Sequence, residues 1–369
     1  MKIAMIGTGY VGLVSGACFA EFGPDVTCVD VDAAKIKRLL NGEIPIYEPG
    51  LHDLVAKGIQ SGRLSFTTDL AHAVSEADAV FIAVGTPSRR GDGHADLRYV
   101  EAAAIEVAKS LKGYTVVVTK STVPVGTGRR VAELIRGANP TAEFDVASNP
   151  EFLREGSAIG DFMRPDRVVI GAETDRARAV MQALYRPLYL METPVVMTTL
   201  ETAELTKYAA NAFLATKITF INEMADLCEK VGANVQDVAR GMGLDGRIGK
   251  KFLHAGPGYG GSCFPKDIAA FIAISEDLGV PFTLLKEVEK INHSQRERFL
   301  SKIRESLWVL KDKKIAVWGL AFKPDTDDVR CSVAIDLVND LLKEGAEVTV
   351  YDPKGTEKAL EFDLIKGAK

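Results

Sequence analysis

Residues 2–12, KIAMIGTGYVG, predict the fold of the N-terminal part of this chain. A short apolar strand over residues 2–6 is followed by glycines spaced as GxGxxG and by an apolar helix predicted to end near Phe22. A second apolar strand, residues 26–29, leads directly into Asp30. Strand, glycine loop, helix, strand and acid, in this order, form the fingerprint of a dinucleotide-binding Rossmann unit. The sequence therefore predicts an α/β domain at the N-terminus.

The fingerprint also predicts the contacts of the cofactor. Its glycines allow the backbone to approach a pyrophosphate at a helix N-terminus. Asp30 is expected to accept hydrogen bonds from the ribose, and its charge would repel a 2′-phosphate, which favours NAD over NADP. Lys35, on the next helix, weakens that preference. The cofactor residues expected from the fingerprint itself are Gly7, Gly9, Tyr10, Val11 and Gly12.

Strands and helices continue to alternate as far as residue 199. Apolar strands over residues 79–84 and 114–119 end at Thr86 and at Ser121 and Thr122. Parallel strands bind ligands beyond their carboxyl ends, which places these hydroxyl groups near a cofactor. The alternative, to which we give equal weight, is that Thr86, Ser121 and Thr122 are ordinary turn residues without a role in binding. Strands over residues 167–171 and 194–198 complete the first predicted domain, 1–199.

The loop NPEFLREG at residues 149–156 follows a further strand, 145–148, and holds two carboxylates, Glu151 and Glu155. Such a pair is often only a solvated surface feature. Its place after a strand in the middle of the domain favours a role in a functional site.

Residues 200–231 contain no proline or glycine, and their apolar residues recur at helical spacing. One helix of this length predicts a spine between domains or a dimer contact. Lys207 and Asn211, four residues apart, share a face of this helix, which is either a solvated face or part of a site. Further helical patterns over residues 234–242, 266–278 and 281–307 predict an all-helical central domain, 200–310. A loop at residues 243–249 presents Arg247.

Residues 256–267, GPGYGGSCFPKD, place a single thiol among four glycines and two prolines. The backbone of such a segment can pass close to a ligand and hold Cys263 in one pose. Lys266 and Asp267 are expected to open a helix, whose N-terminus would lower the pKa of a neighbouring thiol. A buried, inert cysteine in a glycine-rich turn is the alternative, and the flanking Lys266 and Asp267 favour a nucleophile.

The pattern of a strand followed by glycine returns at residues 313–323 and is followed by a helix over 332–342 and a strand over 347–351. These residues predict the start of a second nucleotide-binding fold, 311–369. Too few residues follow to complete a doubly wound sheet, so we expect an incomplete Rossmann-like domain.

Composition limits the class of protein. The 369 residues are 47% hydrophobic and carry a net charge of -5, which argues against a general nucleic-acid binder. Five single cysteines without CxxC pairs favour a reducing compartment over a disulfide framework and give no sign of a metal site. No export signal or long apolar run is evident, so we expect a cytoplasmic protein that does not enter a membrane.

Taken together, these motifs resemble the UDP-glucose dehydrogenase family, within the wider group of nucleotide-sugar 6-dehydrogenases that includes GDP-mannose and UDP-N-acetylmannosamine enzymes. The resemblance covers essentially the whole chain and rests on GTGYVGL, GTP, STVPVGT, NPEFLREG and GPGYGGSCFPKD. It implies two Rossmann-like domains joined by a long helix that also forms a homodimer. Two departures are Pro24, where the family commonly has His, and a shorter C-terminal domain.

The resemblance also implies roles for individual residues. The implied catalytic residues are Cys263 as nucleophile, with Lys207, Asn211, Asp267, Glu151 and Thr122. The implied contacts of the nucleotide sugar are Glu151, Phe152, Leu153, Glu155, Lys207, Asn211, Arg247, Phe252, Tyr259, Gly260 and Lys323, with Arg247 reaching into the site of the second subunit. The implied further contacts of the cofactor are Lys35, Thr86, Ser121, Thr122, Glu155, Lys266 and Arg330.

The chemistry implied is NAD-dependent, four-electron oxidation of UDP-glucose to UDP-glucuronate, a precursor for polysaccharide biosynthesis. A thiol suits the second oxidation, because it forms an adduct with an aldehyde from which another hydride can leave. Two alternatives remain open at this point: the same chemistry on another nucleotide sugar, and a non-catalytic protein that binds NAD or a nucleotide sugar.

Overall fold

The structure is a computed structural model that describes residues 1–89 and 91–369. The chain divides into two compact units, Met1–Lys207 and Tyr208–Lys369, and we describe each by itself. The boundary falls inside one continuous helix, α10 (Leu200–Val231), whose bounds match those expected from the sequence.

The first unit is built on a sheet whose described strands have the order β3-β2-β1-β4-β5-β6-β7-β8. The strands from β3 to β6 pair in parallel, whereas β7 pairs antiparallel with β6, and β8 pairs in parallel with β7. Every residue of β4 and β5 is buried, as a sheet covered on both faces requires. The strands are β1 (Lys2–Ile6), β2 (Asp25–Val29), β3 (Leu64–Thr67), β4 (Ala79–Ile82), β5 (Thr115–Thr119), β6 (Phe144–Ser148), β7 (Val168–Ala172) and β8 (Val195–Thr198).

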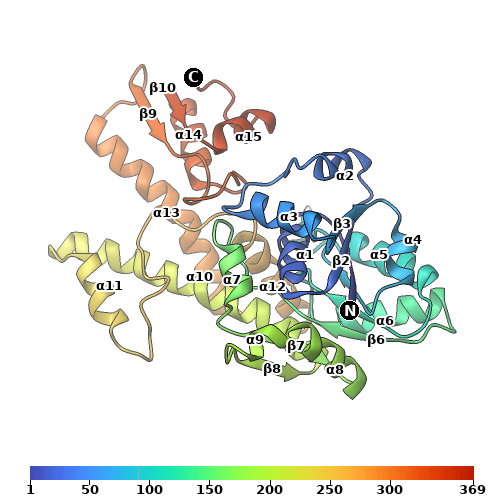
Figure 1. The fold of residues 1–369 in the computed structure, drawn as a ribbon. Helices are drawn as coiled ribbons and strands as arrows, with labels where there is room; N and C mark the ends of the chain where they lie inside the picture. The colour runs from blue at the N-terminus through green and yellow to red at the C-terminus, as the bar shows by residue number, and fades with distance from the viewer. Residues whose placement is uncertain (90) are drawn as a thin grey trace. The chain divides into compact units, whose positions relative to one another are not determined.

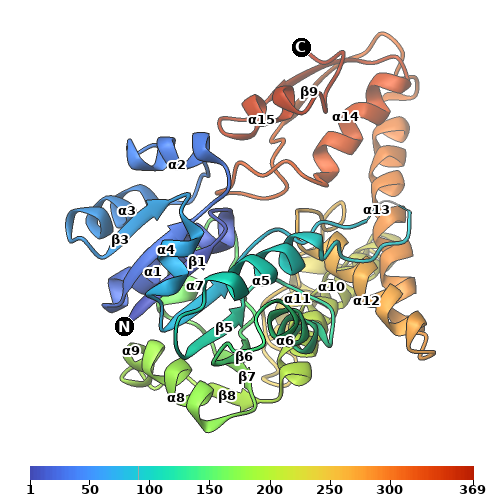
Figure 2. The same ribbon diagram turned by 90° about the vertical axis from the view of Figure 1, so that its right-hand side faces the viewer.

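Helices cover both faces of this sheet (Figure 2) and create two apolar layers. One layer packs against α1 (Tyr10–Phe22), α3 (Leu51–Gln60), α7 (Ala158–Met163), α8 (Asp175–Leu184) and α9 (Arg186–Tyr189). The other packs against α4 (Leu70–Ser75), α5 (Arg98–Ser110) and α6 (Thr127–Ala138). The short helix α2 (Ala33–Leu40) follows β2. This doubly wound α/β arrangement confirms the fold class predicted for the N-terminal part of the chain.

The second unit begins with the remaining turns of α10 and continues through further helices (Figure 1). These are α11 (Val235–Gly243), α12 (Phe264–Asp277) and α13 (Thr283–Leu307). A parallel pair, β9 (Lys314–Trp318) and β10 (Glu347–Tyr351), follows with α14 (Val333–Lys343) and α15 (Gly355–Glu361). The all-helical middle and the small α/β C-terminal part agree with the architecture predicted from the sequence.

Candidate active site

The loop between β1 and α1 has the shape of a dinucleotide-binding loop. A Cβ atom added at Gly12 would lie 1.9 Å from the carbonyl oxygen of Gly7, so only glycine allows α1 to begin this close to the loop. A Cβ atom at Gly9 would meet nothing within 4 Å, which leaves open space beside the loop. Backbone crowded on one side and open on the other fits the pyrophosphate of a dinucleotide.

Asp30 follows β2 and faces this loop. Its Oδ2 atom accepts hydrogen bonds from the backbone nitrogen of Thr8 at 2.9 Å and from Thr8 Oγ1 at 2.6 Å. Lys35 Nζ lies 2.9 Å from the same oxygen, the proximity expected from the sequence. Partial burial opposes ionisation of Asp30, but the hydrogen bonds from Thr8 and Lys35 outweigh it and lower its pKa to about 2. The position therefore carries a fixed negative charge.

The predicted hydroxyl residues tie the ends of neighbouring strands together. Thr86 Oγ1 donates to the carbonyl oxygen of Thr122 at 2.9 Å, and Ser121 Oγ donates to that of Val84 at 2.6 Å. Each hydroxyl fixes one loop against the next at the carboxyl edge of the sheet. Their oxygen atoms retain acceptor capacity, so these bonds leave a contact with the cofactor possible.

Glu151 and Lys207 form a buried ion pair, with Lys207 Nζ 3.1 Å from Glu151 Oε1. Their side chains are 6% and 5% exposed, respectively. The backbone nitrogen of Leu153 donates to the other carboxylate oxygen of Glu151. Two cations lie over the Phe152 ring, with the Arg167 guanidinium 3.6 Å and Lys207 Nζ 5.3 Å from its centroid. The 149–156 loop is thus held against α10, as a role in the site requires.

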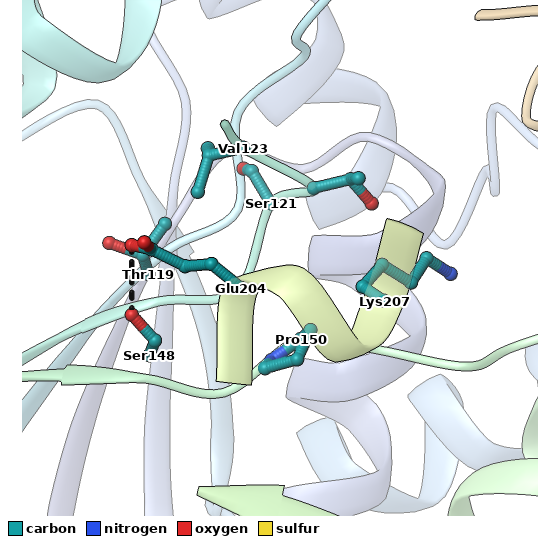
Figure 3. A pocket seen from close by; sticks show the side chains of 8 residues that line it. Thr119, Ser121, Val123, Ser148, Pro150, Glu204 and Lys207 are labelled. Atoms are coloured by element: carbon teal, nitrogen blue, oxygen red, sulfur yellow. Dashed lines mark hydrogen bonds between the residues drawn. The ribbon is translucent and has the colours of Figure 1, made fainter. Parts of the chain in front are cut away.

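A small pocket opens beside this ion pair (Figure 3). Lys207 and Glu204 enter it from α10, and Thr122 from the loop after β5. Its lining consists of Thr119, Ser121, Thr122, Val123, Ser148, Pro150, Glu204 and Lys207. Hydroxyl groups, a cation and a carboxylate therefore converge where the carboxyl ends of β5 and β6 meet α10.

In the second unit, Asp267 is the centre of a buried polar cluster. Its Oδ2 atom accepts a hydrogen bond from Asn211 Nδ2 at 2.6 Å, and its Oδ1 atom lies 2.5 Å from Lys266 Nζ. Asp267 is only 2% exposed, so these two contacts replace the water that its carboxylate loses on burial. Cys263 is exposed and lies near a helix N-terminus, as expected, but α12 begins at Phe264, two residues before the expected start, so that Cys263 is its N-cap residue. The carbonyl oxygen of Cys263 accepts a hydrogen bond from the backbone nitrogen of Asp267 at 2.8 Å.

Two asparagines hold the glycine-rich segment that precedes Cys263. Asn222 Oδ1 accepts from the backbone nitrogen of Gly256 at 2.8 Å. Asn292 bonds to both backbone groups of Tyr259, accepting from its nitrogen at 2.8 Å and donating to its oxygen at 3.1 Å. A Cβ atom at Gly260 would lie 2.1 Å from the carbonyl oxygen of Cys331, so the chain can pass here only as glycine.

Aromatic rings surround the same segment. The rings of Tyr259 and Phe252 lie 5.8 Å and 6.2 Å from that of Phe264, measured between centroids. Lys323 Nζ lies 5.6 Å from the centroid of Phe322, whose ring packs against Gly261. The structure thus brings Phe252, Tyr259 and Lys323, all predicted substrate contacts, to the residues that flank Cys263.

The two predicted arginines are each held by an aspartate two residues earlier. Arg247 pairs with Asp245 at 2.6 Å on an exposed loop, and its side chain is 90% exposed. Arg330 pairs with Asp328, also at 2.6 Å. In the described residues, Arg247 makes no hydrogen bond to any other predicted site residue, so the structure does not bring it into either cluster.

Three family models match successive parts of the chain. Residues 1–189 match the NAD binding domain, residues 201–294 the central domain and residues 316–367 the UDP binding domain of the UDP-glucose/GDP-mannose dehydrogenase family. The chain belongs to this family. The resemblance inferred from the sequence motifs is therefore confirmed, and the match to the NAD binding domain agrees with the cofactor predicted from Asp30.

Individual relatives of this chain support the same family membership. It is 62% identical to the UDP-glucose 6-dehydrogenase of Rhizobium meliloti (strain 1021), over 100% of this chain and 84% of the relative. It is 53% identical to UDP-glucose 6-dehydrogenase TuaD of Bacillus subtilis (strain 168), over 95% of this chain and 76% of that protein. A solved UDP-glucose dehydrogenase from Pyrobaculum islandicum superposes with a TM-score of 0.96 at 43% identity and covers 100% of this chain and 85% of that structure.

The sequence did not reveal two buried carboxylates that organise the first unit of this dehydrogenase-family chain. Glu48 accepts a hydrogen bond from the Tyr10 hydroxyl and from the backbone nitrogens of Gly156 and Ala158, at 2.6 Å and 2.8 Å. It therefore joins the cofactor helix to the 149–156 loop. Burial raises the pKa of the Tyr10 phenol, and its bond to Glu48 adds to that shift. The only signal was a glutamate before a Pro-Gly turn, which is typical of any surface loop.

Glu204 is the second such carboxylate. It lies on α10 and accepts from the backbone nitrogens of Gly126 and Gly128, both at 2.7 Å, at the start of α6. Ser148 Oγ donates to it at 3.2 Å, the bond dashed in Figure 3. Burial raises the pKa of Glu204, and the backbone hydrogen bonds oppose that shift. Its spacing of three residues before Lys207 was the one available sequence signal.

No helix in the described part of the chain is both long and apolar enough to cross a membrane.

Proposed function

We propose that this protein is an NAD-dependent UDP-glucose 6-dehydrogenase that converts UDP-glucose to UDP-glucuronate by a four-electron oxidation. The observation that carries the proposal is Cys263 at the start of α12, beside the buried cluster of Asp267, Asn211 and Lys266. An alcohol dehydrogenase that stops at the aldehyde needs no such thiol. The similarity to proteins named UDP-glucose 6-dehydrogenase, which extends over 95% or more of this chain, supports the substrate.

The loop 7–12 and Asp30 are the residues that would hold NAD, with Lys35 beside them. Each oxidation needs one NAD as its hydride acceptor, so two NAD would bind in turn for each UDP-glucose. Around it, we assign contacts to Thr86, Ser121, Thr122, Glu155, Lys266 and Arg330. The fixed charge of Asp30 supports a preference for the cofactor without a 2′-phosphate.

Cys263 is the proposed nucleophile of the second oxidation. The first oxidation removes a hydride from C6 and the proton of its hydroxyl group. The thiolate sulfur then attacks the aldehyde carbon, the C=O π bond opens as the C–S bond forms, and the oxygen takes up a proton to give a thiohemiacetal. Loss of the second hydride and of the hydroxyl proton converts this adduct to a thioester. Water then attacks the thioester carbonyl, the C–S bond breaks, and the thiolate leaves. Either Asp267 or Glu151 takes the proton from that water.

Lys207 and Asn211 are the proposed stabilisers of the oxyanions formed in these steps. They lie four residues apart on α10, and each is buried and held by a carboxylate. Donors fixed before the reaction stabilise developing negative charge without reorganisation. The remaining contacts assigned to the nucleotide sugar are Glu151, Phe152, Leu153, Glu155, Arg247, Phe252, Tyr259, Gly260 and Lys323.

We further propose three domains, 1–199, 200–310 and 311–369, and a homodimer formed through α10. Exposed apolar residues at seven-residue spacing on this helix, Phe213, Phe220 and Leu227, support the dimer. A cytoplasmic location and a role in supplying uronic acid for polysaccharide synthesis complete the proposal.

A substrate comparison tests the proposed function. Purified protein with NAD is offered UDP-glucose, GDP-mannose and UDP-N-acetylmannosamine, and NADH formation is followed by absorbance. We expect the highest kcat/KM with UDP-glucose and UDP-glucuronate as the product by mass spectrometry. Preference for another sugar would preserve the chemistry but overturn the substrate. Binding without turnover of any of the three would favour a non-catalytic binding protein.

A further inference from the structure

Lys120 carries a cation in the interior of the first unit, at the point where β5 ends. The residue is 3% exposed, and the chemistry described above does not use it. Burying an ammonium group is costly unless its surroundings compensate for the lost water. In the residues that the structure describes, no carboxylate pairs directly with Lys120, and the groups that contact its ammonium are neutral.

Those groups form a small, closed network. Lys120 Nζ donates to Asn149 Oδ1 at 3.0 Å and to the Tyr185 hydroxyl at 3.2 Å. The Tyr185 hydroxyl itself donates to Asn149 Oδ1 at 2.5 Å. The rings of Phe162 and Tyr185 lie 5.6 Å and 5.9 Å from the ammonium, within the range of cation–π attraction.

Hydrogen bonds hold both the side chain and the backbone of Asn149 in place. Its Nδ2 atom donates to the carbonyl oxygen of Val169 at 2.8 Å. Its backbone nitrogen donates to the carbonyl oxygen of Thr119 at 2.9 Å. Pro150 follows, and Glu151 comes next, with its carboxylate 3.1 Å from Lys207 Nζ. The network therefore sets the base of the loop on which Glu151 is carried.

The charges around Lys120 point to the same residue. Burial lowers the pKa of Lys120 to about 8, and the negative charge of Glu151 opposes that shift. The other titratable groups that act on it are Lys207 and the thiol of Cys18. Glu151 thus interacts with two buried lysines. Lys207 contacts it directly, and Lys120 acts on it through its charge without direct contact.

We propose that Lys120 is a positioning residue for Glu151: it fixes Asn149, and through Asn149 the loop geometry with which Glu151 assists thioester hydrolysis. This inference rests on the function proposed above. It predicts that the loss of Lys120 affects hydrolysis more than either hydride transfer.

The test compares Lys120→Met with the wild-type protein in rapid mixing at saturating UDP-glucose and NAD. Methionine preserves the length of the side chain and removes its charge and donors. We expect a fast phase of about two NADH per active site, followed by a steady-state rate reduced at least about tenfold. Intact-protein mass spectrometry should then show the thioester on Cys263. The KM for NAD should change by less than about twofold.

Two further variants make the result specific. Lys112→Met makes the same substitution at an exposed lysine before β5 and should behave as wild type. Tyr185→Phe removes one donor to Asn149 but retains Lys120, and should accumulate the adduct to a smaller extent. If Lys120→Met does not fold, Tyr185→Phe still provides the test.

Failure of the inference differs from failure of the proposed function. A wild-type protein that forms no UDP-glucuronate would overturn the function itself. A wild-type protein that is active, together with Lys120 and Tyr185 variants that hydrolyse the thioester at the normal rate, would overturn the inference. Equal slowing of both hydride transfers without an adduct would also overturn it, because that pattern indicates a purely structural role.

Discussion

Asp30 is the residue whose chemistry decides cofactor choice. Its carboxylate is held by Thr8 and Lys35, and a phosphate beside it would meet a fixed negative charge. We expect kcat/KM to be at least about tenfold higher with NAD than with NADP, corresponding to about 1.4 kcal/mol or more. Asp30→Asn should reduce this ratio. Steady-state kinetics with both cofactors measures it, and equal efficiencies in the wild type would contradict the assignment.

The same residue gives a prediction for pH. The folded-state pKa of Asp30 is lowered from 3.8 to about 2, so the stability it contributes is present above the unfolded value and is lost as pH falls through about 2. Between pH 7.5 and 9 its charge is constant, and so is that of the 2′-phosphate of NADP, whose second pKa is about 6. The ratio of NAD to NADP efficiency should therefore be the same at both ends of that range. A ratio that changes steeply between pH 7.5 and 9 would show that another group sets the preference.

Cys263 is the residue on which the second oxidation depends. Serine at this position is a poorer nucleophile and leaving group, so Cys263→Ser should stall as a slowly hydrolysed ester adduct, visible as a mass increase after incubation with UDP-glucose and NAD. Cys263→Ala should show no adduct. Turnover should fall by several orders of magnitude, roughly, in both variants. Near-normal uronate formation by Cys263→Ala would instead make this cysteine structural.

At the scale of elements, α6 depends on a carboxylate supplied by α10. Glu204→Ala would leave the backbone nitrogens of Gly126 and Gly128 without their acceptor. We expect the free energy of unfolding to fall by about 1–3 kcal/mol for each group left buried without a partner. Glu201→Ala, one turn earlier, removes a half-buried partner of Arg129 and should lower the free energy of unfolding by less than about 1 kcal/mol. Chemical denaturation of the three proteins measures the difference. Equal stability of both variants would show that Glu204 does not cap α6.

Elements with a strong periodic signal were predictable from the sequence. The long helix α10 and the strand β1 have the bounds expected from apolar periodicity and the glycine loop. The short strand β3 was not predicted, because four residues carry too little alternation. The residues that bind elements together were also missed. Glu48 contacts a loop 108 residues away, and no local pattern encodes such a partner.

At the scale of the whole molecule, the fold class could be predicted but not every strand direction. The antiparallel pairing of β7 with β6 could not be predicted from the sequence. All residues of β7 are buried, and a fully buried apolar strand has the same residue pattern whether it pairs parallel or antiparallel with its neighbour. The candidate site was predictable where motifs carry it, in the 7–12, 149–156 and 256–267 segments. The network of Lys120, Asn149 and Tyr185 was not, since its members are scattered single residues.

The proposed homodimer is a property of the whole molecule that can be tested directly. Phe213, Phe220 and Leu227 expose apolar side chains on α10, and burying them in an interface would remove that surface from water. We expect a dimer by light scattering coupled to size exclusion, and a monomer when Phe220 and Leu227 are both changed to Glu. Lys230→Gln, at the exposed end of the same helix, is the control. A wild-type monomer at micromolar concentration would contradict the dimer.

The stoichiometry of the reaction tests the thioester mechanism most directly. A limiting, known amount of UDP-glucose is consumed to completion with excess NAD, and NADH and the nucleotide-sugar product are both quantified. The thioester mechanism through Cys263 predicts two NADH and one UDP-glucuronate for each UDP-glucose consumed. One NADH with the aldehyde as the final product would contradict it.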